Sequence, residues 1–197
     1  MIRPATTADA PALRAIERAA GEAFRAIGLD VVADDEPPPA AVLAAYATAG
    51  LAFVAERATE RSAGGASIGT ERSAGGASIG TERSAGGAST GTEPVGYLLT
   101  EIVDGCAHVE QVSVLPRMRG RRIGGGLVEH LAGWARDRRL PALTLTTYRD
   151  VPWNGPYWVR LGFRELIELP PGLRAIRDAE TARGLDVWPR LAMRREL

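Results

Sequence analysis

The segment from Val112 to Leu127, VSVLPRMRGRRIGGGL, constrains the fold of this chain more than any other stretch. Its first residues read as the end of a strand, which stops at Pro116, and an arginine- and glycine-rich turn follows. Apolar residues then recur at helical spacing and predict a helix from Gly124 to Arg138. A strand, a turn and a helix in direct succession indicate an α/β fold in which the helix packs against a sheet.

The turn itself has the chemistry of a pyrophosphate site. The first amides of a helix have no partner within the helix, and small residues let a ligand approach them closely. Arginine side chains add fixed positive charge beside those amides. The predicted binding residues are Arg119, Gly120, Arg121, Arg122, Ile123, Gly124 and Gly125. The segment lacks both the Gly-Lys-Ser/Thr ending of a P-loop and the glycine spacing of a dinucleotide fingerprint.

Hydrophobic patterns elsewhere predict a mixed α/β sheet with the element order β-α-α-β-β-β-α-β-α-β-β. Asp104 and Gly105 are expected to form a two-residue hairpin turn. The strands are expected at 2–5, 51–56, 94–103, 106–115, around Leu143 and Leu145, at 163–169 and at 189–194. The helices are expected from Leu13 to Ile27, at 40–49 with Val42, Leu43 and Tyr46 facing inward, at 124–138 and from Asn154 to Leu161, with loop at 28–39 and largely loop at 170–184.

A tandem repeat interrupts this pattern. The 11-residue unit TERSAGGASIG occupies 59–69 and 70–80, and it recurs as TERSAGGASTG at 81–91. Three glycines in each unit disfavour a helix, and one isoleucine at most offers too little apolar surface to offset chain entropy. We therefore expect one domain over 1–197, interrupted at 59–93 by a flexible insertion in a β-hairpin. Stacking of the units as a solenoid is the alternative.

Composition argues against several classes of function. The 24 basic and 24 acidic residues balance, so attraction to nucleic acid or to an anionic membrane is not expected. Every basic residue is arginine, so no lysine can form a Schiff base. A single cysteine, Cys106, predicts neither a disulfide nor a metal cluster. The N-terminus has no secretory pattern and no apolar run is long enough to span a membrane, which predicts a cytoplasmic protein.

The turn resembles the signature of the GCN5-related N-acetyltransferase (GNAT) family, Q/R-x-x-G-x-G/A, which lies between a central strand and the following helix. One register fits it literally with Arg121, Gly124 and Gly126. A second register uses Arg119, Arg122 and Gly124, with arginine in the first glycine position. We prefer the second, because Leu127 then supplies the apolar helix residue that the family has three places after the last glycine.

Further matches follow in the family's order along the chain. WVRLGF at 158–163 stands where the family has Y-x-x-L-G-F, and VPWNGPYW overlaps it and fits the family's asparagine-bearing turn. The resemblance implies a GNAT-like fold and an N-acetyltransferase that uses acetyl-CoA, needs no metal and acts on a small-molecule or peptide amine. It also implies that the strand before the turn diverges from its neighbour. The backbone of Val112, Ser113 and Val114 would then bind the pantetheine arm and polarise the thioester carbonyl.

The resemblance also suggests a base. Family members place a histidine or a glutamate on the central strand, where it acts directly or through water. His108 and Glu110 both stand at such positions, and alternation predicts that they share one face of the strand with Val112 and Val114. The alternative is that Glu110 only orients the substrate and that His108 packs at the edge of the core.

The family's acid is the tyrosine of Y-x-x-L-G-F, and Trp158 occupies that position here. An indole cannot deliver a proton at a useful pKa, so the adjacent Tyr157 is the candidate acid, with core packing as its alternative role. Asn154 is expected either to cap the helix that it precedes or to contact the cofactor. The acidic residues Asp30, Asp34, Asp35 and Glu36 are expected either to be a solvated loop or to attract a cationic amine to the acceptor mouth.

Three functions remain open on the sequence: an N-acetyltransferase, a module that binds acetyl-CoA without turnover, and an interaction or linker protein built on the repeat. Deleting residues 59–91 tests the third. We expect the deletion to leave the fold and cofactor binding intact, because the repeat contributes little apolar surface to a core. Circular dichroism and a thermal-shift measurement with acetyl-CoA check this, and loss of function on deletion would favour the interaction role.

Overall fold

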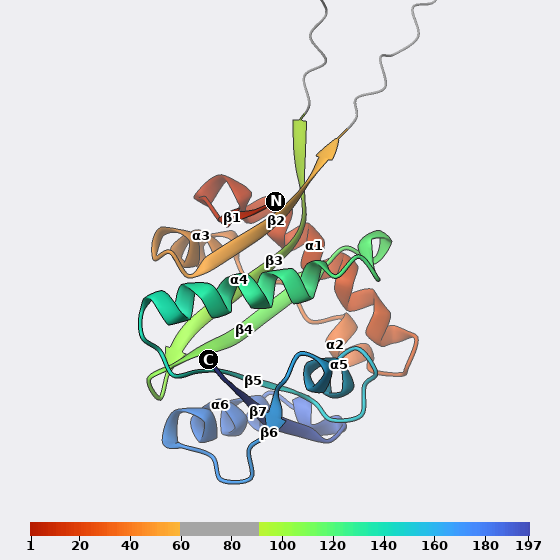
Figure 1. Cartoon of the computed structure of the whole chain (residues 1–197). Helices are drawn as coiled ribbons and strands as arrows, with labels where there is room; N and C mark the ends of the chain where they lie inside the picture. The colour runs from red at the N-terminus through yellow and green to blue at the C-terminus, as the bar shows by residue number, and fades with distance from the viewer. Residues whose placement is uncertain (60–90) are drawn as a thin grey trace, which may run out of the picture.

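The computed structural model describes residues 1–59 and 91–197. Their strands form one mixed sheet in the order β1-β2-β3-β4-β5-β7-β6 (Figure 1), which confirms the predicted fold class. Neighbouring strands are antiparallel except for β4 and β5, which are parallel. The strands are β1 (Ile2–Pro4), β2 (Ala52–Thr59), β3 (Gly91–Val103), β4 (Cys106–Val114), β5 (Ala142–Tyr148), β6 (Arg164–Glu165) and β7 (Arg190–Glu196).

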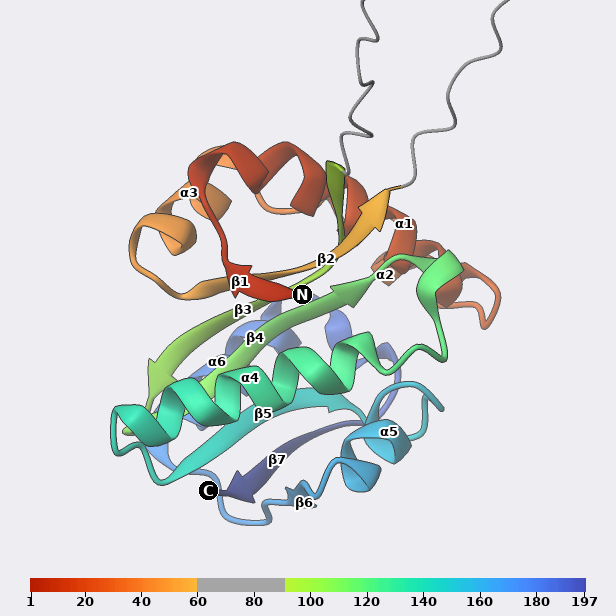
Figure 2. The same cartoon turned by 45° about the horizontal axis from the view of Figure 1, so that its top comes forward.

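Helices cover both faces of this sheet, with α4 in front and α6 behind in the view of Figure 2. The α-helices are α1 (Ala10–Arg25), α2 (Asp30–Ala33), α3 (Ala40–Thr48), α4 (Ile123–Asp137), α5 (Gly155–Arg160) and α6 (Pro171–Ala182). Short 3-10 turns are η1 (Thr7–Asp9), η2 (Pro116–Met118) and η3 (Leu185–Val187). Helix α5 shares the face of α4, whereas α1, α3 and α6 hydrogen-bond to side chains on the opposite face of the sheet.

Helix α4 packs on the sheet through the stripe that its periodicity predicts. Its buried residues are Leu127, Val128, Leu131, Ala132 and Ala135. On the opposite face, α1 buries Leu13 and Ile16 against the same sheet. No helix in the described ranges, 1–59 and 91–197, combines the length and the apolar character that a membrane crossing needs.

The parallel ladder between β4 and β5 is short. Its pairs run only from Ala107 opposite Leu143 to Val109 opposite Leu145. Beyond Val109, β4 continues to Val114 paired with β3, and β5 continues to Tyr148 paired with β7. The two strands therefore diverge in the middle of the sheet and leave one edge of β4 without a strand beside it.

A β-bulge lies where this divergence begins. Leu99 pairs with Gln111 and Thr100 pairs with Val109, so Glu110 is an extra residue without a partner on β3. A bulge shifts the alternation of side chains by one position. His108 therefore faces the side of Gln111 and Ser113, opposite to Val112 and Val114. The expectation that His108, Glu110, Val112 and Val114 share one face is wrong for this reason.

Several predicted boundaries need correction. The expected loop at 28–39 contains the short helix α2, and the stretch at 170–184 is mostly the helix α6. The carboxylate of Asp104, far away in sequence, accepts hydrogen bonds from the amides of Gly172 and Leu173 at 2.9 Å each and so caps α6. Strand β6 is only two residues long, and Val42 of α3 is exposed rather than buried.

The hairpin turn at Asp104 and Gly105 is confirmed, with φ values of +49° and +72° that match the predicted turn. The limits of the insertion differ from those expected. Thr59 pairs with Gly91, and its hydroxyl donates to the Gly91 carbonyl at 2.8 Å. Thr59 and residues 91–93 therefore belong to strands, while the rest of the expected insertion lies outside the described residues.

Candidate active site

A cavity of about 850 Å³ lies where β4 and β5 diverge. Residues from helices on both faces of the sheet line it, so it extends through the gap between the two strands. We call the part lined by Gly124, Asn154 and Tyr157 the front half. The part lined by residues of α1, α2 and α6, among them Glu17 and Glu180, is the rear half.

Free backbone amides gather at the start of α4, in the front half. Within the described part of the chain, five of these amides donate no hydrogen bond to the protein: Gly120, Arg122, Ile123, Gly124 and Gly125. The amide of Arg121 is the exception, since it donates to the Met118 carbonyl at 3.4 Å. All of the five except Gly125 line the cavity. Such a cluster at a helix N-terminus is suited to bind the oxygens of a phosphate.

The backbone of this turn favours one of the two motif registers. Arg122 has φ of +58° and Gly120 has φ of +76°, both in the left-handed region. The first glycine position of the register that begins at Arg119 is Arg122, so glycine geometry is present although the residue is arginine. In the literal register, Gly124 and Gly126 lie within α4 and need no such conformation.

The arginines of the turn do not all face the cavity. Arg119 and Arg122 line it, and the Arg119 guanidinium lies 5.9 Å from the ring centre of Trp153. Arg121 instead lines a separate hollow of about 340 Å³, which Arg57 also borders. On the strand side, Val112, Ser113 and Val114 all line the cavity along the unpaired edge of β4.

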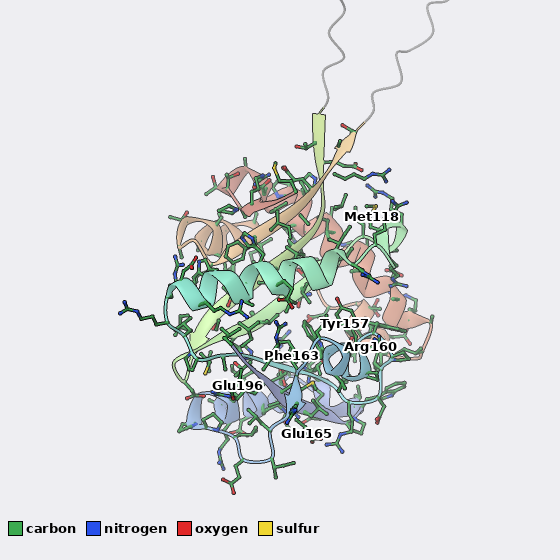
Figure 3. The ribbon with its side chains drawn as sticks, viewed as in Figure 1. Met118, Tyr157, Arg160, Phe163, Glu165 and Glu196 are labelled. Atoms are coloured by element: carbon green, nitrogen blue, oxygen red, sulfur yellow. The ribbon has the colours of Figure 1, made fainter. Side chains whose placement is uncertain are left out.

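Figure 3 labels Tyr157 on α5, below the start of α4 and next to Arg160. A Cβ atom added at Gly124 would lie 2.9 Å from the Tyr157 hydroxyl oxygen, so this hydroxyl is next to the free amides. Desolvation raises the pKa of Tyr157, which keeps its proton available for donation. Trp158 is only 6% exposed and packs edge-on against Phe163, with ring centres 5.3 Å apart. Both residues line the cavity, but Trp158 is packed into the core, whereas the hydroxyl of Tyr157 lies next to the free amides.

Asn154 precedes α5 and lines the cavity. Its backbone carbonyl accepts the amides of Tyr157 at 2.8 Å and Trp158 at 3.0 Å, but its side chain makes no capping bond. The side-chain carboxamide of Asn154 therefore does not cap α5. Glycine is required next to it, because a Cβ at Gly155 would lie 2.2 Å from the Arg149 carbonyl oxygen.

The two candidate bases lie in different surroundings. Glu110 is exposed to the cavity at the bulge, and desolvation by the surrounding protein raises its pKa, with Glu101 adding repulsion. His108 is 1% exposed, does not line the cavity and has its Nδ1 atom 3.0 Å from the Thr144 hydroxyl. Burial lowers the pKa of His108 to about 4, so this imidazole is neutral near pH 7.

The acidic stretch that follows α1 makes ion pairs with nearby arginines. Asp30 and Asp34 pair with Arg25, at 3.1 and 2.6 Å. Asp35 pairs with Arg183 at 2.9 Å, and Glu36 lies 3.1 Å from Arg18. Of these four carboxylates only Asp35 lines the cavity. These four carboxylates are therefore paired with arginines, which favours the solvated loop over a site that attracts a cationic amine.

Residues of the rear half are the ones that sequence reasoning missed. They include two aromatic side chains, Phe24 and Trp153, with ring centres 5.7 Å apart, and three glutamates, Glu17, Glu101 and Glu180. A signal existed for Glu17, which interrupts the inward stripe of Leu13, Ala20 and Phe24 on α1. Glu101 follows the apolar run of β3 and precedes Ile102 and Val103, and this charge within an apolar stretch is a second signal.

No group of three or more His, Cys, Asp or Glu side chains in residues 1–59 and 91–197 is placed to hold a metal ion. The front half instead presents amide donors, two arginines and the edge of a strand. This donor set fits a long anionic ligand with an amide-bearing arm, since phosphate suits the amides and the strand edge suits the arm.

Comparison with known proteins agrees with this geometry. Residues 70–163 match the model of the acetyltransferase (GNAT) family. Rv2747 from Mycobacterium tuberculosis, solved in complex with CoA, is similar at a TM-score of 0.59 and 17% identity over 100% of this chain and 99% of that one. PaiA N-acetyltransferase from Thermoplasma acidophilum, solved with coenzyme A, reaches 0.61 at 9% identity over 100% and 98%. The ribosomal-protein-S18-alanine N-acetyltransferase from Escherichia coli reaches 0.55 at 16% identity over 100% and 92%.

The strand-turn-helix segment, the divergence of β4 from β5 and the shared fold agree with the sequence match over 70–163. Residues 70–163 are thus similar in sequence to the GNAT acetyltransferase family, and the chain shares its fold with solved N-acetyltransferases.

Proposed function

We propose that this protein transfers an acetyl group from acetyl-CoA to the amine of a small molecule or peptide. The observation that carries the proposal is the cluster of free amides at Gly120, Arg122, Ile123 and Gly124, which line a cavity that runs through the gap in the sheet. A donor held by its diphosphate at this cluster can extend along β4 and present its reactive end at the gap. An acceptor can then approach from the rear half.

Donor binding is assigned to the front half. The amides at the start of α4 and the side chains of Arg119 and Arg122 would hold the diphosphate. The backbone of Val112, Ser113 and Val114 would pair with the pantetheine arm as an added strand does. Asn154, whose side chain is not engaged in capping, would contact the same arm.

Bound acetyl-CoA supplies an activated acetyl group: the amine nitrogen bonds to the acetyl carbon, the carbon–sulfur bond breaks and CoA leaves as the thiol. Glu110 would accept the proton that the amine loses, because it lies at the bulge beside the gap and its raised pKa suits a base. Tyr157 would return a proton to the sulfur. A backbone amide of β4 would polarise the thioester carbonyl.

Glu110 is preferred to His108 as the base on geometric grounds. His108 is enclosed between β3 and β5 and lies outside the cavity lining, whereas Glu110 is open to the cavity. His108 can contribute by holding the junction of the two strands through Thr144. This is a positioning role.

An acceptor panel tests the proposed function. The full chain is incubated with acetyl-CoA and a set of primary amines, and release of the CoA thiol is measured beside direct binding of acetyl-CoA by calorimetry. Amine-dependent release of CoA, with N-acetylated product in the mass spectrum, is the expected result. Binding without release by any amine would instead favour a module that senses acetyl-CoA, and absence of binding would end both proposals.

Substitution of Glu110 tests the base. Its carboxylate must be ionised to accept a proton, so kcat/KM is expected to fall as the pH drops through a pKa above the ordinary carboxyl value of 4.5. Desolvation is the main cause of the raised pKa; Glu101 on β3, Glu180 on α6 and Glu17 on α1 raise it further, and Arg183, which follows α6, lowers it.

We expect Glu110→Gln to lower kcat/KM by about hundredfold at neutral pH. The ratio of the wild-type to the variant rate, measured with one amine, cancels the titration of the amine itself. This ratio should shrink toward acidic pH. A ratio that does not change with pH would contradict a base role for Glu110.

Two glycines of α4 test the donor site as a matched pair. Gly124→Ala places a Cβ beside the Tyr157 hydroxyl and over the free amides, so we expect acetyl-CoA to bind about tenfold more weakly. Gly133→Ala adds the same atom to the same helix with nothing within 4 Å, and should leave binding unchanged while stabilising the fold by about 0.5–1 kcal/mol. Isothermal calorimetry and thermal unfolding measure both effects, and equal affinities of the two variants would refute the site.

A further inference from the structure

We propose that the acceptor is a cationic amine, one that carries a positive charge in addition to the amine that reacts, and that the rear half of the cavity selects it through unpaired carboxylates. This inference rests on the proposed acetyl transfer and names the chemical class of the acceptor.

The carboxylates of the rear half come from several separate elements. Glu17 belongs to α1, Glu101 to β3, Glu110 to the bulge of β4 and Glu180 to α6. Glu180 pairs with Arg190 at 2.6 Å and also with Arg177, so its charge is neutralised. The other three make no salt bridge with an arginine in the part of the chain that the structure describes.

The partners of these three carboxylates are neutral or absent. Glu17 accepts a hydrogen bond from the Tyr97 hydroxyl, and Glu101 accepts one from the Tyr46 hydroxyl. Burial raises the pKa of both tyrosines far above neutral pH, so the phenols keep their protons and do not change the charge of the glutamates. Glu110 has no hydrogen-bonded side-chain partner among the described residues.

Arginines at the rim do not offset this negative charge. Arg183 pairs with Asp35, Arg18 pairs with Glu36, and Arg190 pairs with Glu180, so each of the three has its own acidic partner. The rear half therefore holds up to three unpaired carboxylates when all are ionised. Like charges in a partly dehydrated cavity repel one another, and a cation placed among them relieves that repulsion.

A second, independent feature of the same wall also indicates a ligand. The hydroxyl of Tyr148 is buried and has no hydrogen-bond partner in the residues described, and Tyr148, 2% exposed overall, lines the cavity. Buried polar groups in native proteins are nearly always satisfied, so an unsatisfied one in a cavity wall points to a ligand or water that completes it. Apolar neighbours, among them Phe24, Val32 and Ile176, provide contacts for the carbon chain of an acceptor.

The test uses three acceptors that share a four-carbon chain: diaminobutane, butylamine and aminobutanoate. Each offers a primary amine at one end, and the other end is a second, positively charged amine, a neutral methyl group or a negative carboxylate; the two equivalent amines of diaminobutane account for a factor of two in rate only. With saturating acetyl-CoA, we expect kcat/KM to be highest for diaminobutane and lowest for aminobutanoate, with about a hundredfold span from two changes of charge. Equal rates for the three acceptors would overturn the inference and leave the acetyltransferase proposal standing.

Glu17→Gln removes one carboxylate while keeping an acceptor for the Tyr97 hydroxyl. We expect it to lower kcat/KM for diaminobutane by about tenfold, to change butylamine little and to leave acetyl-CoA affinity unchanged. Glu22→Gln is the matched control, because Glu22 lies on the same helix, is paired with Arg25 at the surface and does not line the cavity. Equal losses from both variants would contradict the inference.

A binding experiment distinguishes failure of this inference from failure of the proposed acetyl transfer. Calorimetric titration of diaminobutane into the chain saturated with CoA should show binding that Glu17→Gln weakens, whether or not acetyl transfer is observed. If acetyl-CoA binds and amines are acetylated but this titration shows no dependence on Glu17, the charge selection is refuted alone. If neither acetyl-CoA nor diaminobutane binds, both proposals fail.

Discussion

The short ladder between β4 and β5 is the constraint on which the site depends. Three residue pairs, ending at Val109 and Leu145, join two parts of the sheet that are otherwise well paired within themselves. Past that point the edge of β4 has backbone donors and acceptors without a neighbouring strand. Unsatisfied backbone groups destabilise a fold unless a ligand or water completes them. We therefore expect a ligand or water to hydrogen-bond along this edge of β4. The bulge at Glu110 begins the divergence and turns a carboxylate into it.

Something other than the ladder must therefore hold the two parts together. Helix α4 lies across the sheet and contacts β1, β2, β3, β4 and β5. Its residues Leu127 and Leu131 are fully buried against the sheet. Truncating a buried leucine to alanine typically lowers the free energy of unfolding by about 2–5 kcal/mol. His108 adds a buried hydrogen bond to Thr144 across the same junction. The helix that carries the free amides also packs across both sides of the gap, so the position of these amides and the width of the gap depend on the same packing.

Sequence alone predicts the parts of this protein in which local and global signals agree. The strand-turn-helix segment, the hairpin at Asp104 and Gly105 and the order of the main strands are of this kind, because periodicity and turn chemistry act over a few residues. The sequence pattern alone does not predict the length of helix α6, because its cap comes from Asp104, far away along the chain. Strict alternation puts His108 on the wrong face of β4, because the sequence pattern does not indicate the bulge. Glu17 and Glu101 join one cavity only through tertiary folding.

The distribution of charge also depends on contacts that only tertiary folding creates. Long arginine side chains at the surface reach the acidic stretch after α1, so Asp30 and Asp34 gain partners there. In the rear half, Glu17 and Glu101 are held by tyrosine hydroxyls, which fix their orientation but leave their charge in place. Desolvation raises the pKa of Glu17 and of Glu110, because the charged form is poorly hydrated there. A bound cation favours that charged form and lowers both pKa values, so cation binding and ionisation of these carboxylates reinforce each other.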